Sequence, residues 1–116
     1  MANRPSCGIF FDDSSGASHY PTRNIVRNNF FVGCGDNGIE INNVVHELFI
    51  INNYFMTGTE SGYNMTDDIT INAGMTAGSI LIADNYSSLE ALGDFVNDNS
   101  GGGTIRVFNN NYTADA

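Results

Sequence analysis

Two pairs of adjacent carboxylates are the residues of this chain best suited to acid–base chemistry. Asp12 and Asp13 follow an apolar run, and Asp67 and Asp68 precede another. Carboxylates on either side of a glycosidic bond are what hydrolysis of a sugar chain requires. Neighbouring residues of a strand point to opposite faces, so the members of a pair do not converge on one bond. We therefore expect these acids to cap turns or to face solvent, and we predict that the protein is not an enzyme and has no catalytic residue.

The histidines and arginines give no stronger signal for a reaction. His19 lies in a polar insertion and His46 lies between two apolar runs, so we expect both to be loop or packing residues. Arg27 and Arg106 alternate with apolar residues, as outward residues of strands do. The glycine- and aspartate-rich repeat that binds calcium in some solenoids is not present in the sequence. The prediction is no metal and no cofactor.

Cys7 and Cys34 are 27 residues apart, which is about one repeat of the chain. If the two residues lie one above the other, a disulfide is one interpretation, and it requires α-carbons within roughly 7 Å. Two small buried thiols are the other interpretation. The sequence leaves both open.

The net charge of −9 comes from thirteen acids against four arginines. Nucleic acids and anionic membranes bind basic surfaces, so neither is expected as a partner. No apolar run approaches the length of about 18 residues that a transmembrane span needs. The first eight residues do not have the charged and then apolar pattern of a signal peptide, so we expect synthesis in a cytoplasm.

One short pattern occurs four times and organises the chain. Apolar residues alternate with others and are followed by an Asn pair and an aromatic residue, with substitutions, in residues 24–31, 48–55, 80–87 and 105–112. The first position of the Asn pair is residue 28, 52, 84 or 109, so the copies start 24, 32 and 25 residues apart. A period of this length indicates a repeat architecture.

A second set of apolar segments precedes the copies, at residues 9–11, 39–41 and 69–71, with a weaker one at 95–97. Alternation with a period of two predicts strands with one buried face. Each repeat therefore contains two strands, and we expect a third short one at the aromatic position. Seventeen asparagines and thirteen glycines argue against a helical protein.

A chain that winds once per repeat would stack equivalent strands in parallel, about 4.8 Å apart. Equivalent side chains then form rows in the interior. The predicted rows are Val26, Ile50, Ile82 and Val107; Ile9, Ile39, Ile69 and Phe95; and the aromatic row Phe31, Phe55 and Tyr112, in which Ser87 replaces the aromatic residue.

The most regular row is the second asparagine of each pair: Asn29, Asn53, Asn85 and Asn110. Asparagine tolerates the left-handed backbone conformation, and its amide can bond to the next repeat. We predict that these four residues form a structural ladder at a turn.

The alternating residues, the Asn pair and the aromatic residue together resemble the repeats of right-handed parallel β-helix proteins of the pectin-lyase-like fold, over residues 8–113. This resemblance implies an all-β fold, a right-handed parallel β-helix of about four coils. Residues 8–116 would be a single domain, and residues 1–7 an N-terminal arm or cap. The fold occurs in lyases, hydrolases, phage tailspikes and virion decoration proteins, so it does not select one function.

Apolar residues at outward strand positions indicate an interface with another chain, because such a patch on a monomer promotes aggregation. The candidates are Phe10, Phe30, Phe49, Ile51, Tyr54 and Phe108. The ends of a solenoid also need a cover. We therefore expect a homo-oligomer, and the resemblance to virion β-helices favours a trimer.

Three functions remain on the sequence alone, and one of them is a fragment of a tailspike or adhesin whose activity lies elsewhere. The first is a structural virion protein, a trimeric bacteriophage capsid decoration (cement) protein on the virion surface, which has the major capsid protein or another virion protein as its partner. The alternative is an extracellular β-helix that binds or cleaves a polysaccharide, with Tyr20, Tyr54 and Tyr63 as surfaces for sugar rings.

Overall fold

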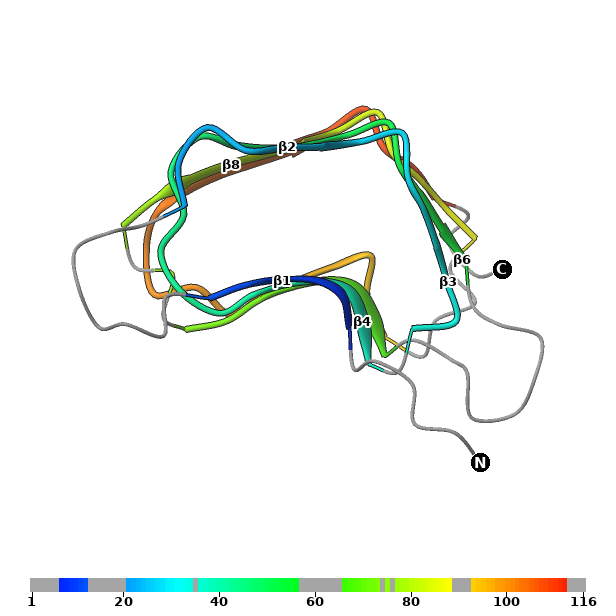
Figure 1. Cartoon of the computed structure of the whole chain (residues 1–116), viewed down its shortest axis with the longest axis horizontal. Coiled ribbons are helices and arrows are strands. Elements are labelled where there is room, and N and C mark those ends of the chain that lie inside the picture. Colours follow the sequence, from blue (N-terminus) through cyan, green and yellow to red (C-terminus); the bar gives the residue numbers. More distant parts are fainter. Residues whose placement is uncertain are drawn as a thin grey trace.

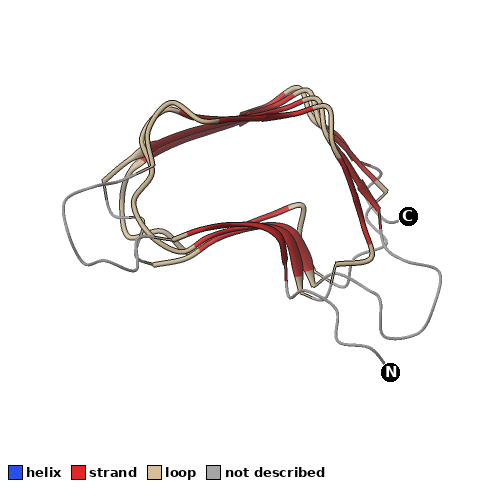
Figure 2. Ribbon diagram, viewed as in Figure 1, coloured by secondary structure: helices blue, strands red, loops and turns tan. Residues whose placement is uncertain are grey.

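The computed structural model describes residues 7–12, 21–34, 36–56, 66–73, 75, 77–88 and 93–112. Strands and turns make up this part of the chain, and it contains no helix, hence none that could cross a bilayer (Figures 1 and 2). The strands are β1 (Cys7–Phe11), β2 (Ile25–Arg27), β3 (Phe30–Val32), β4 (Asn37–Ile41), β5 (Leu48–Ile51), β6 (Tyr54–Met56), β7 (Asp67–Ile71), β8 (Ser79–Ala83), β9 (Tyr86–Ser87), β10 (Val96–Asp98), β11 (Thr104–Phe108) and β12 (Asn111–Tyr112).

The strands form three parallel sheets, and within a sheet each strand pairs with the strand three places along the chain. We call them the β1 sheet (β1-β4-β7-β10), the β2 sheet (β2-β5-β8-β11) and the β3 sheet (β3-β6-β9-β12). Viewed down the short axis of the molecule, corresponding strands overlie one another (Figure 1). We use "level" for three consecutive strands, so that β1, β2 and β3 are the first level. The prediction of an all-β fold with stacked parallel strands is confirmed.

The pairing registers join equivalent residues of the repeats. Val26 pairs with Ile50, Ile50 with Ile82, and Ile82 with Val107, as the sequence predicts. Phe31 pairs with Phe55, and Phe55 with Ser87. Successive side chains of a strand point to opposite faces, so inward and outward residues alternate. The inward residues are apolar, and the outward residues face solvent or other side chains.

The core lies between the three sheets. Its fully buried side chains include Ile39, Ile41, Leu48, Ile50, Phe55, Ile69, Ile71 and Ile82. Burying one such side chain contributes about 1.5–3 kcal/mol. Phe31 and Phe55 stack with ring centroids 4.9 Å apart, along the axis on which the strands stack.

Two interior assignments of the sequence analysis need correction. Val96, and not Phe95, pairs with Ile69, so the predicted row is displaced by one residue. Phe95 is nevertheless buried, and its ring meets Phe55 edge to face at a centroid distance of 5.9 Å. Val107 lies in its predicted row but is 44% exposed, because β11 is the last strand of its sheet and has a neighbour on one side only.

The left-handed residues are one position earlier than predicted. Asn28, Asn52, Asp84 and Asn109, the first members of the four pairs, have φ between 54° and 60°. Asparagine and aspartate adopt this conformation more readily than other residues with a side chain. The first residue of each pair therefore makes the turn, and the second makes a continuous row of hydrogen bonds between levels.

Candidate interface on the outer faces of two sheets

The second asparagines form a continuous hydrogen-bonded row at the corner between the β2 and β3 sheets. The backbone N–H of Asn29 donates to Oδ1 of Asn53 (3.0 Å), that of Asn53 to Oδ1 of Asn85 (2.8 Å), and that of Asn85 to Oδ1 of Asn110 (3.0 Å). The Asn53 side-chain N–H also donates to the carbonyl of Val26 at 2.9 Å. These amides are occupied by the protein itself, so their role is structural.

Asp67 and Asp68 are buried, so the expectation that these acids could face solvent is wrong for this pair. Asp67 accepts hydrogen bonds from Thr70 Oγ1 (3.2 Å), Asn97 Nδ2 (3.0 Å) and the backbone N–H of Asp94 (2.8 Å). Asp68 accepts one from the hydroxyl of Ser87. Asp67 and Asp68 are buried to 5% and 1% exposure, so neither can meet a polymeric substrate.

The burial of Asp68 follows from the residue opposite it. At the first two levels, glycines face the aromatic row: a Cβ on Gly8 would lie 2.7 Å from the ring of Phe31, and one on Gly38 would lie 2.8 Å from that of Phe55. At the third level the aromatic residue is Ser87, which leaves room for a side chain at position 68. Sequence reasoning identified the serine in the aromatic row but not the aspartate that fills the space.

Burial raises the pKa of Asp68 to about 6. Loss of water around the carboxylate is the largest cause, the hydrogen bond from Ser87 opposes it, and the charge of Asp67 adds to it. A raised pKa in an open cleft would indicate a general acid. In this closed interior it indicates a group that weakens the fold when it is ionised.

The remaining chemical candidates are dispersed. Asp12 accepts a hydrogen bond from Asn42 Nδ2 at 3.1 Å, while Asp13 and His19 lie outside the described residues. His46 pairs with Thr22 in an isolated parallel bridge. Across the described ranges, no three His, Cys, Asp or Glu side chains gather as a metal site.

Cys7 and Cys34 are not joined by a disulfide in this structure; Cys7 is half-buried and Cys34 is buried. Burial raises the pKa of the Cys34 thiol, and the proximity of Cys7 raises it further. A buried, protonated thiol is a weak nucleophile.

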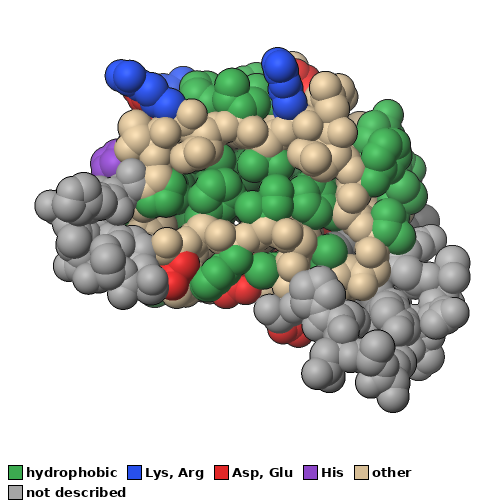
Figure 3. Space-filling model, in the orientation of Figure 1, with side chains coloured by type: hydrophobic (Ala, Val, Ile, Leu, Met, Phe, Trp, Pro, Cys, Tyr) green, Lys and Arg blue, Asp and Glu red, His purple; other side chains and the backbone are tan. Residues whose placement is uncertain are grey.

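The outer face of the β1 sheet is polar. Glu40 accepts hydrogen bonds from Asn72 Nδ2 (3.1 Å) and Asn37 Nδ2 (3.4 Å), and Thr70 donates to Oδ1 of Asn37 at 2.8 Å. Phe10, at the first level, is the exposed aromatic residue of this face. In Figure 3 several acidic side chains lie along this side of the molecule.

The outer face of the β3 sheet is apolar. Phe30 and Tyr54 stack with centroids 5.0 Å apart and an interplanar angle of 14°, and Tyr86 follows at 5.6 Å. Phe30 is 67% exposed and Val32 55%. Figure 3 shows hydrophobic side chains along this side.

The outer face of the β2 sheet carries apolar residues and arginines. Ile25, Phe49, Leu81 and Arg106 form one outward row. Ile25 is 58% exposed, whereas Phe49 is half-buried by the strands on both sides. The second outward row is Arg27, Ile51, Ala83 and Phe108, with Phe108 exposed and Ile51 half-buried. In Figure 3 basic side chains stand above this sheet.

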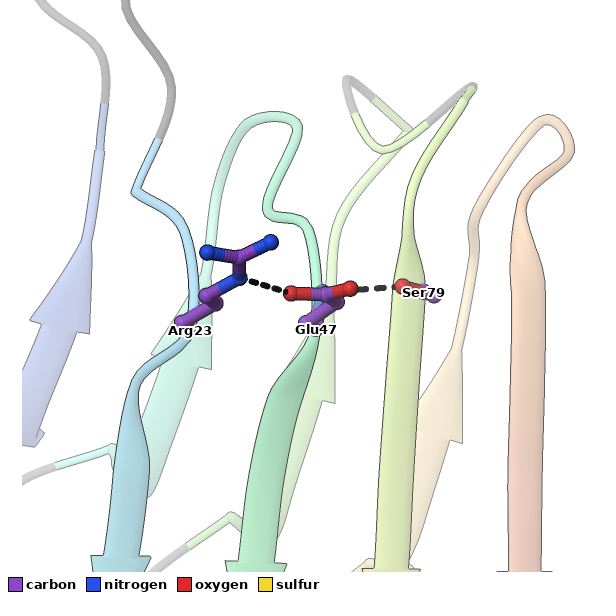
Figure 4. Close-up of polar contacts among 3 residues, drawn as sticks. All are labelled: Arg23, Glu47 and Ser79. Carbon is purple, nitrogen blue, oxygen red and sulfur yellow. Dashed lines mark hydrogen bonds and ion pairs between the residues drawn. The ribbon is translucent and has the colours of Figure 1, made fainter.

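A shallow groove of about 170 Å³ lies at the beginning of β5, β8 and β11, on the β2-sheet face. Phe49 and Leu81 form part of its apolar lining, and Glu47, Ser79 and Arg106 supply polar groups. Figure 4 shows its polar border: Arg23 Nε donates to Glu47 Oε2 at 2.7 Å, and the backbone N–H of Glu47 donates to the hydroxyl of Ser79 at 2.8 Å.

The predicted interface residues therefore lie on three faces. Phe30 and Tyr54 are on the β3 sheet, Phe49, Ile51 and Phe108 are on the β2 sheet, and Phe10 is on the polar β1 sheet. Sequence reasoning did not select Ile25, Val32, Leu81 or Tyr86, although the same alternation places all four outward. The outer faces of the β2 and β3 sheets are therefore mostly apolar and adjoin each other, whereas the outer face of the β1 sheet is polar.

Comparison of the chain with protein-family models, with curated proteins and with solved structures finds no match.

Proposed function

We propose that this chain is a structural protein that acts as a homotrimer, built as a right-handed parallel β-helix of four coils. In this proposal it decorates the capsid surface of a bacteriophage and stabilises it through contact with the major capsid protein. The observation that carries the proposal is the division of the outer surface into two adjoining apolar faces and one polar face.

The energetics favour burial of the apolar faces. The exposed apolar side chains on the outer faces of the β2 and β3 sheets are Ile25, Phe30, Val32, Tyr54 and Phe108, and Phe49, Ile51 and Leu81 on the outer face of the β2 sheet are half-buried. Large contiguous apolar patches on a protein surface mark interaction sites. Each fully buried side chain would contribute about 1.5–3 kcal/mol. Several such residues per chain are enough to stabilise an oligomer.

The geometry of the aromatic residues bears on the alternative, a polysaccharide-binding function. A sugar ring packs on the face of an aromatic ring. Phe30 and Tyr54 are nearly parallel and 5.0 Å apart, so their faces cover each other and their edges point outward. Tyr20 and Tyr63 lie outside the described residues. The stack is better suited to side-by-side protein packing, and Asp67 and Asp68, the acid pair considered for polysaccharide cleavage, are both buried.

Sedimentation velocity on matched surface variants tests the proposal. Phe30→Ser combined with Val32→Ser should shift the protein from trimer to monomer, because both side chains lie on an apolar face. The control is Phe10→Ser, which removes an exposed aromatic residue from the polar face and should leave the trimer intact. A wild-type monomer that binds or cleaves a polysaccharide would contradict the proposal.

A further inference from the structure

We propose that the contact between copies joins the β3-sheet face of one chain to the β2-sheet face of the next, with Tyr54 and Tyr86 seated in the groove beside Phe49 and Leu81. This inference rests on the proposed oligomer and specifies which two surfaces meet.

The groove has the chemistry of a tyrosine site. Its apolar lining includes Phe49 and Leu81, and Glu47 and Arg106 are charged groups at its border. Tyrosine presents an apolar ring and a polar tip, and its hydroxyl finds a hydrogen-bond partner when the ring is buried. A docked hydroxyl can donate to the Glu47 carboxylate or accept from the Arg106 guanidinium.

The levels of the two faces match. Tyr54 is on β6 and Phe49 on β5, both at the second level, while Tyr86 on β9 and Leu81 on β8 share the third. When two copies pack side by side with parallel axes, strands of the same level face each other. The two tyrosines of one copy then meet the two apolar residues of the next without any shift along the axis.

Charge selects this pairing over contact between identical faces. Arg23, Arg27 and Arg106 all lie at the β2 sheet, with Glu47 as their acidic neighbour at the groove. Packing two β2-sheet faces together would bring the arginines of both chains into one interface. Against the β3 sheet, the arginines instead meet the uncharged side chains of Phe30, Tyr54 and Tyr86, so no like charges are brought together.

Contact between two different faces is a heterologous contact, which closes into a ring when the rotation between copies allows it. The β2 and β3 sheets adjoin at the asparagine corner, so one chain can offer one face to each neighbour (Figure 1). The polar β1 sheet is then left on the outside of the ring. Its network around Glu40 and Asn72 suits contact with water.

Directed cross-linking tests the two faces. In a Cys7→Ser, Cys34→Ser background, one chain carries Leu81→Cys and a second, differently tagged chain carries Tyr86→Cys. The chains are co-expressed and treated with a bismaleimide that spans the roughly 10 Å between packed sheets. We expect a covalent dimer that contains both tags, and little product from either variant alone.

The outcomes separate this inference from the proposed oligomer. A trimer that links Leu81→Cys to itself, and not to Tyr86→Cys, would overturn the face assignment and leave the oligomer standing. A monomer would overturn both. The dissociation constant of the trimer is an independent measurement, and Leu81→Asp should raise it at least 100-fold. Tyr54→Phe with Tyr86→Phe should raise it about tenfold, because two hydroxyl hydrogen bonds are lost. Unchanged dissociation in both variants would also overturn the assignment.

Discussion

The hydroxyl of Ser87 donates a hydrogen bond to Oδ2 of Asp68 in the interior of the fold, at the level where an aromatic ring and a glycine would continue the pattern. At the level before it, Phe55 packs against Gly38. At the third level the aromatic row has the small residue Ser87, and the residue opposite it is Asp68 and not glycine. The core therefore contains an ionisable group with little access to water.

Protonation of Asp68 should make the protein more stable in mild acid than at neutral pH. Its pKa is about 6 in the folded chain, against an ordinary value of 3.8 for aspartate, so the folded state binds the proton more tightly than the unfolded state does. Between these two values stability falls as pH rises, and above pH 6 the full cost of about 3 kcal/mol is present. Asp68→Asn should raise the free energy of unfolding at pH 7 and flatten its dependence between pH 4 and 6. Chemical denaturation at fixed protein concentration measures both effects.

A matched control for this experiment is Ser87→Ala, which removes the donor to the carboxylate. It should lower the free energy of unfolding by about 1.5–3 kcal/mol at pH 7 and by less at pH 4, where Asp68 is neutral. If Asp68→Asn destabilises the protein equally at pH 4 and pH 7, the account of a costly buried charge is wrong.

Asn53 should be the most sensitive member of the asparagine ladder. Asn53 is fully buried. Replacing it with alanine removes the Oδ1 that accepts from the N–H of Asn29 and the Nδ2 that donates to the carbonyl of Val26. We expect Asn53→Ala to cost about 3 kcal/mol or more, since several buried polar groups are affected together. Asn110→Ala, at the partly exposed last level, should cost clearly less. Equal losses in thermal or chemical unfolding would contradict the ladder's cooperative role.

The first asparagine of a pair should tolerate glycine, whereas the second should not. Asn52 has φ of 56°, a backbone conformation that glycine adopts readily. Asn52→Gly should therefore change the free energy of unfolding by less than about 1 kcal/mol. Asn52→Val should cost about 1–2 kcal/mol or more, because a β-branched residue disfavours the left-handed region. Asn53→Gly, at a position without positive φ, should be far more damaging than Asn52→Gly. Unfolding midpoints of the three variants check this order.

The parallel stacking was predictable because equivalent residues recur at each repeat. Val26, Ile50 and Ile82 could be aligned from the sequence alone, since each precedes an Asn pair by the same number of residues. The pairing of Val96 with Ile69 could not, because the third and fourth repeats differ in length and no motif fixes the register there. The alternation of residues 104–108 also does not show that β11 is the last strand of its sheet. Val107 is exposed because β11 has this position.

The surface was predictable only in part. Alternation identified Phe30 and Tyr54 as outward residues, but it does not say which outward residues share a face. That requires the register of the strands within each sheet, which places Tyr86 beside Tyr54 and Leu81 beside Phe49. The burial of Asp68 was missed because it depends on Ser87, 19 residues away, through packing between two sheets.

The central claim is that the apolar faces of the β2 and β3 sheets are buried between copies. The most direct test is the mass of the wild-type protein by light scattering after size-exclusion chromatography, over a wide range of concentration. The account predicts a particle of three chains, each of 12.5 kDa, that persists on dilution. A particle of one chain at every concentration, with Phe30 and Leu81 accessible to solvent, would contradict it.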